Sequence, residues 1–186
     1  MSFVRWILVA GLCATLGFLS PWAYAQTTDG KEITVYIPQR AEPWEGKGLL
    51  IEGSTVVPVR AVGEALDMAV HWDAQTRTVR VEDNDDPEWG LLRVGEDIAA
   101  FYTGDGPAPD KCVDLEMPVF IRNDRAMVPL RTFFELFRVY IFGSRDSATI
   151  LTHETVEEGY WDRAIERERS CTADDLAALG ISQDEQ

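Results

Sequence analysis

The sequence contains few of the residues that build metal and catalytic centres. Only two of its 186 residues are histidine and three are cysteine. The histidines, His71 and His153, cannot form a three-histidine copper or zinc site by themselves. The chain also has no G-x-S-x-G, H-E-x-x-H, catalytic-cysteine or phosphate-loop motif. We therefore expect no metal ion and no cofactor, and the usual catalytic signatures are absent.

Basic residues are also scarce. The chain has 17 Lys and Arg against 32 Asp and Glu, for a net charge of −15. A surplus of negative charge repels the phosphates of nucleic acids and the head groups of anionic lipids. Neither is expected as a partner.

Long apolar runs are limited to one, at residues 6–19. This run follows Arg5 and precedes Ala23-Tyr24-Ala25, which is the pattern of a secretory signal peptide with its cleavage site. We predict a signal peptide at residues 1–25 and a secreted, periplasmic or cell-envelope location. A retained signal anchor is the alternative. No other segment is long and apolar enough to span a membrane, so the mature chain is not expected to be an integral membrane protein.

Two cysteines remain after cleavage, Cys112 and Cys171. An oxidising compartment favours a disulfide between them, which would close a loop of about 60 residues and contribute roughly 4 kcal/mol in the chain-entropy model. A redox or metal pair is the alternative, but neither cysteine belongs to a C-x-x-C motif.

The dominant feature of the chain is a stretch at residues 54–81 that recurs 71 positions later. In each copy an apolar run leads into Val-Pro-(Val/Leu)-Arg and then into residues with helical periodicity. We expect the proline in the first turn of the helix. The signature positions are Val57, Pro58, Arg60, Glu64, Trp72 and Asp73 in the first copy and Val128, Pro129, Arg131 and Glu135 in the second.

The helical periodicity predicts one buried stripe in each copy, with Val62 and Phe133 at equivalent buried positions. Each signature arginine precedes a glutamate by four residues. The arginine could grip an anionic ligand or pair locally with this glutamate. We favour local pairing, because the same residue recurs in both copies.

Short apolar runs separated by turn residues flank each helix, so each unit is expected to be β-β-α-β-β. The units cover about residues 49–82 and 118–153, and a hairpin at 91–103 links them. The predicted fold is α+β, with antiparallel sheets wrapped on helices, within a domain at 26–153.

This pattern resembles the copper amine oxidase N-terminal-like domain, the stalk domain of many exported bacterial proteins, over about residues 33–153. The residues that carry the resemblance are Val57-Pro58-Val59-Arg60, Glu64-Ala65-Leu66, Trp72-Asp73 and Thr76-Arg77-Thr78-Val79. The second copy has Gly143-Ser144 in place of Trp-Asp. The resemblance implies an α+β fold and a non-catalytic accessory module. It does not imply copper, because the metal of that enzyme family belongs to a separate catalytic domain.

Two acidic segments surround the second copy. The run at 82–88 is expected to be a solvated turn, since Pro87 stands where a calcium loop needs a ligand. Residues 154–186 form a predicted acidic helical tail, with helices at 156–169 and 173–179 and a capping box at Thr172 and Asp175. The tail either docks on the sheet or binds a partner.

The expected function is that of a non-catalytic exported accessory module that binds a protein partner or a cell-envelope polymer. A small envelope hydrolase with Asp/Glu chemistry and a purely structural spacer are the alternatives. Aligned exposed aromatics would favour binding, and a cleft with two carboxylates about 5 to 9 Å apart would favour a hydrolase. A featureless surface would favour a spacer.

Overall fold

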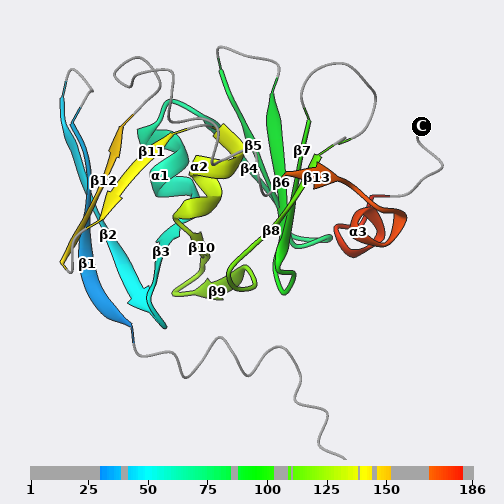
Figure 1. Ribbon diagram of the computed structural model, residues 1–186, viewed down its shortest axis with the longest axis horizontal. Coiled ribbons are helices and arrows are strands. Elements are labelled where there is room, and N and C mark those ends of the chain that lie inside the picture. Colours follow the sequence, from blue (N-terminus) through cyan, green and yellow to red (C-terminus); the bar gives the residue numbers. More distant parts are fainter. Residues whose placement is uncertain are drawn as a thin grey trace, which may run out of the picture.

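Two β-sheets and three helices make up the described part of the chain in a computed structural model (Figure 1). The structure describes residues 30–38, 42–84, 88–102, 109, 111–137, 139–143, 146–151 and 168–181. The predicted signal peptide and its cleavage site lie outside these residues. Among the described residues, no helix combines the length and the hydropathy needed to cross a membrane.

Seven strands form the first sheet, in the spatial order β11 (Tyr140–Gly143), β12 (Ser147–Leu151), β1 (Lys31–Ile37), β2 (Trp44–Ile51), β3 (Ser54–Pro58), β10 (Arg125–Pro129) and β9 (Phe120–Arg122). Six strands form the second sheet, in the order β13 (Arg169–Ser170), β8 (Lys111–Asp114), β7 (Ile98–Tyr102), β6 (Trp89–Arg93), β5 (Thr78–Glu82) and β4 (Ala69–Asp73). A parallel bridge between Val94 and Val119 joins them. The fold is therefore mostly sheet with few helices, which agrees with the α+β prediction.

Helices α1 (Val59–Ala65) and α2 (Arg131–Phe137) lie between the two sheets and complete the core (Figure 1). Val62 and Phe133 are 0% and 2% exposed, so their predicted burial is confirmed. Gly63 allows α1 to approach β4 closely, because a Cβ atom there would lie 2.6 Å from the side chain of Val70. The two helical stripes thus meet each other and the strands inside a single core.

The prediction of purely antiparallel sheets is wrong at one pair. β1 runs parallel to β12, with Val35 opposite Ala148, and antiparallel to β2 on its other side. β1 precedes both units of the predicted repeat. β1 lies between β12 and β2 in the sheet and buries Ile33, Val35 and Ile37 in the core. The order of the strands in the sheet therefore differs from their order along the chain.

The two signature prolines end strands rather than open helices, which corrects the expectation of a first-turn proline. Pro58 is the last residue of β3 and the N-cap of α1, with an extended backbone (φ −66°, ψ 120°). Pro129 ends β10, and α2 begins two residues later, at Arg131. Strands also begin at Trp44 and Lys111, outside the predicted repeat units and their linking hairpin. Apolar contacts made there in the folded chain, including burial of Cys112, compensate for weak local signals.

Strands β3 and β10 pair in a symmetric register. Val57 lies opposite Val128, its counterpart 71 positions along the chain. On either side Pro58 faces Met127 and Val56 faces Pro129. Met127 is the counterpart of Val56, and Pro129 is the counterpart of Pro58, under the same shift of 71 positions. The strand pair is therefore symmetric about its centre.

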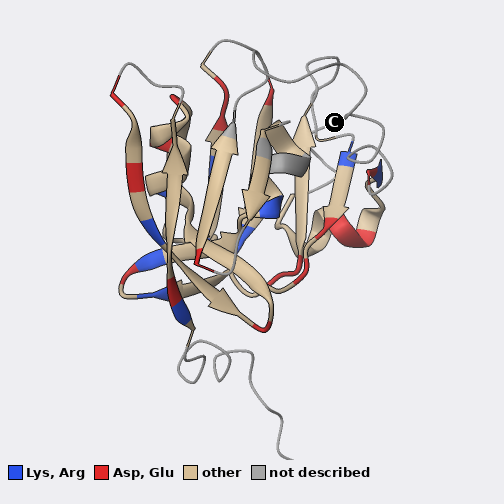
Figure 2. Ribbon diagram, turned by 60° about the vertical axis from the view of Figure 1, so that its left-hand side comes forward, with Lys and Arg blue, Asp and Glu red and all other residues tan. Residues whose placement is uncertain are grey.

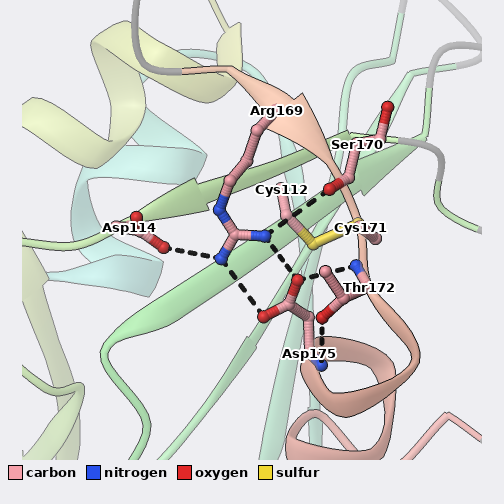
Figure 3. Close-up of polar contacts among 7 residues, drawn as sticks. All are labelled: Cys112, Asp114, Arg169, Ser170, Cys171, Thr172 and Asp175. Carbon is pink, nitrogen blue, oxygen red and sulfur yellow. Dashed lines mark hydrogen bonds and ion pairs between the residues drawn. A yellow bond between two sulfur atoms is a disulfide. The ribbon is translucent and has the colours of Figure 1, made fainter.

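The C-terminal segment docks on the six-stranded sheet, held by the predicted disulfide between Cys112 and Cys171 (Figure 3). β13 pairs with β8, and α3 (Ala173–Ala178) follows with a capping box between Thr172 and Asp175. The sequence predicts Arg169 at the end of a helix, but it lies in strand β13. Glu168 is not helical either, and residues 156–167 of the predicted helix lie outside the described residues.

Arg169 is the polar centre of this segment. Its guanidinium contacts Asp114 at 2.8 Å and forms an ion pair with Asp175 (Figure 3). The hydrogen bonds from Arg169 hold the pKa of the Asp175 carboxyl well below its usual range, although partial burial opposes this shift. Figure 2 shows the acidic first turn of α3, which contains Asp174 and Asp175.

Candidate functional site

A groove of about 680 Å³ opens beside α1, between the edges of the two sheets. Its floor comes from β4 and β5, where Val70, Trp72 and Val79 line it. One wall is the start of α1, and the other is the hairpin formed by β9 and β10. Within the described chain, β4 and β9 are edge strands. The groove therefore combines two parts of the sequence about 60 residues apart.

Trp72 is the largest apolar side chain of the floor and is 41% exposed. It lies opposite Val79 in the ladder between β4 and β5. Because side chains alternate across a strand, Val70 and Trp72 share the groove face, while His71 points to the other face. His71 is an exposed residue of β4.

The turn after Trp72 explains the aspartate and threonine of the signature. Asp73 Oδ1 accepts hydrogen bonds from the backbone N–H groups of Gln75 (2.7 Å) and Thr76 (3.3 Å). These bonds lower the pKa of the Asp73 carboxyl. The hydroxyls of Thr76 and Thr78 also share a hydrogen bond of 2.8 Å. Asp73 thus holds the turn that sets the end of β4, and with it the position of Trp72.

Four charged side chains line the groove. Arg60 and Glu64 come from α1, while Asp124 and Arg125 come from the tip of the β9–β10 hairpin. Asn123 and Asp124 have φ values of 50° and 59°, as a two-residue type I′ turn requires. Arg60 Nε lies 3.9 Å from Glu64 Oε1, and both side chains are 62% exposed. This local pair matches the sequence expectation, but it is long and solvated and is worth little.

The second signature arginine has a different partner. Arg131 Nη1 donates to Glu116 Oε1 at 2.8 Å, and Ser54 Oγ donates to the other oxygen of the same carboxylate. The expectation that Arg131 pairs locally with Glu135 therefore missed its observed contact. The side chain of Glu135 lies outside the described part of the structure. Glu116 precedes β9, and only the tertiary fold brings it to the start of α2.

The remaining signature residues are structural. Val57, Pro58, Val128 and Pro129 are all buried and belong to the central β3–β10 pair. Sequence reasoning overlooked Asp124 and Arg125 as groove residues. The signal in the sequence is the polar hairpin tip Arg122-Asn123-Asp124-Arg125, which by itself predicts only a turn.

Two further aromatic surfaces lie outside the groove. Tyr36 and Phe142 are exposed and align across Thr149 on β1, β12 and β11. On the other sheet, the guanidinium of Arg80 lies 4.3 Å from the centre of the Trp89 ring, which stacks on Tyr102. A pure spacer is expected to have a featureless surface, whereas this surface carries exposed aromatic side chains.

A metal centre finds no support in the described residues, which contain no group of three His, Cys, Asp or Glu side chains able to hold an ion. Cys112 and Cys171 are joined to each other. His153 and residues 85–87 of the acidic run lie outside the description. The groove itself contains two carboxylates, of Glu64 and Asp124, and both are exposed.

A comparison with protein families shows which family the chain resembles. The family described as copper amine oxidase N-terminal domain matches residues 36–152, which include the groove, both signature stretches and the β3–β10 pair. A comparison with curated proteins found no match.

Proposed function

The chain belongs to the copper amine oxidase N-terminal domain family, whose domain is non-catalytic, and on this premise we propose that it is an exported accessory module. It binds a protein partner or a cell-envelope polymer through the groove at Trp72. The predicted signal peptide and the disulfide support an oxidising location outside the cytoplasm.

The exposed indole of Trp72 carries this proposal. A tryptophan on a groove floor offers a large apolar face to a ligand, and full burial of such a side chain is worth roughly 2 to 3 kcal/mol. Trp and Arg are also the residues most often found at the energetic centres of interfaces. The groove presents Trp72 together with Arg60 and Arg125.

The hydrolase alternative is less well supported by the groove. General acid catalysis needs one carboxyl group in an apolar environment that keeps it protonated near neutral pH. The Glu64 side chain is 62% exposed and lies next to Arg60, so its surroundings are not apolar. Asp124 is exposed at a hairpin tip. The groove is better suited to hold a ligand than to protonate one.

The test is capture from an envelope extract by the mature chain, with insoluble cell-wall polymer and solubilised protein assayed separately. Trp72→Ala should reduce capture by about tenfold or more if the ring is buried in the complex. His71→Ala is the matched control, since it alters the neighbouring residue on the opposite face. Equal capture by wild type and Trp72→Ala would show that the groove is not the binding site, and no capture at all would favour the spacer.

A further inference from the structure

The symmetric pairing of β3 with β10 places the two units of the chain face to face. Val57 opposes Val128, and the flanking pairs exchange under a shift of 71 residues, as at the centre of an isologous dimer interface. Each helix therefore faces the hairpin of the other unit. The helix α1 faces the β9–β10 hairpin across the groove, and α2 faces the β2–β3 hairpin at the corresponding place.

Between α2 and the β2–β3 hairpin, the chain places the carboxylate of its own Glu116. The shift relates Arg60 to Arg131 and Arg125 to Ser54. The carboxylate of Glu116 lies between Arg131 and Ser54 and accepts a hydrogen bond from each, at 2.8 Å from Arg131 Nη1. The helix start is further joined to the hairpin by a 2.7 Å bond from the Leu130 N–H to the Thr55 carbonyl.

At the α1 position the corresponding place is the open groove. Arg60 has its acidic neighbour Glu64 at 3.9 Å, a longer contact than that of Arg131 with Glu116. No described residue forms an ion pair with Arg125. A serine in one half is thus replaced by a second arginine in the other, so the groove offers a carboxylate two guanidinium donors, alongside the exposed carboxylates of Glu64 and Asp124.

We propose that the groove binds a carboxylate side chain from an extended segment of a partner protein, between Arg60 and Arg125 and next to Trp72. This inference rests on the proposed function and names the ligand of the same groove. Arg60 and Arg125 supply two guanidinium groups that can donate charge-assisted hydrogen bonds to a carboxylate. A protein segment is favoured because Glu116 is presented in this way, with Leu115 packed on the core and Met117 only 5% exposed.

The probe for this site is a fluorescently labelled peptide with the chain's own sequence Val113-Asp114-Leu115-Glu116-Met117-Pro118, titrated with the mature protein. The control peptide carries Glu116→Gln. The glutamate peptide should bind about tenfold more tightly, as expected for a charge-assisted contact. The ratio of the two affinities should fall towards one in Arg60→Gln and in Arg125→Ser. The ratio should stay about tenfold in the control variant Arg80→Gln, because Arg80 lies on another face.

Each outcome decides the inference. Equal affinity of the two peptides, no binding of either, or a glutamate preference that survives in the double variant of Arg60 and Arg125 would overturn it. The proposed function is judged separately by the dependence of envelope capture on Trp72. Trp72-dependent capture of cell-wall polymer without peptide binding would keep the groove as a binding site and reject the acidic protein segment. Circular dichroism and thermal melts establish that each variant is folded.

Discussion

Replacement of Phe133 by alanine should create a cavity at the centre of the fold. Phe133 is 2% exposed, and its ring lies 6.2 Å from that of Phe137, centre to centre, within the shared core. Its Cε1 atom would lie 4.0 Å from a Cβ atom added at Gly63, so the ring fills the space next to α1. Loss of a buried phenylalanine typically costs about 3 to 5 kcal/mol, from lost transfer energy and an unfilled cavity.

Urea titration of the mature protein measures this loss, because the midpoint should fall while the slope stays constant. Phe133→Leu retains most of the volume and should cost roughly 1.5 kcal/mol or less. Glu64→Ala is the exposed control, with an expected change within about 0.5 kcal/mol. If Phe133→Ala and Glu64→Ala destabilise the protein equally, Phe133 does not occupy the core position described.

Four shorter predictions follow from other parts of the molecule. The denatured, unreduced mature protein should show no reactive thiol, because Cys112 and Cys171 are joined; labelling of two groups per chain would contradict this. The pKa of Asp175 is lower in the folded state than in the unfolded state. The carboxylate therefore contributes its full stabilisation of the fold above about pH 4, and this contribution is lost as the pH falls further. An acid titration of stability should show the loss in the wild type and not in Asp175→Asn. The Thr132 hydroxyl is buried and has no hydrogen-bond partner among the described residues, so Thr132→Val should raise the free energy of unfolding by roughly 1 kcal/mol. A lower melting temperature of this variant would contradict the prediction. Chelation should leave the melting temperature unchanged in calcium-free and calcium-containing buffer, and one equivalent of copper by elemental analysis would bring an oxidase-type function back into consideration.

Several features of this protein could be predicted from residue spacing. The apolar stripes of the two helices identified Val62 and Phe133 as buried, because helical periodicity fixes which side chains share a face. The disulfide could be predicted because only two cysteines follow the predicted signal peptide. The signature also pointed to Trp72, although the internal repeat itself remains a prediction from the sequence, with which the β3–β10 register is consistent.

Tertiary structure decided the rest, because it depends on contacts between distant segments. The parallel pairing of β1 with β12 follows from burial of β1 in the core, which no local pattern encodes. Arg60 and Arg131 occupy the same place in the sequence pattern, yet one lines an open groove and the other binds Glu116. The difference arises because the segment after β8 passes α2 and supplies a carboxylate there, whereas the groove beside α1 remains open. Spacing along the chain sets which residues share a face, but only the packed fold sets which charges meet.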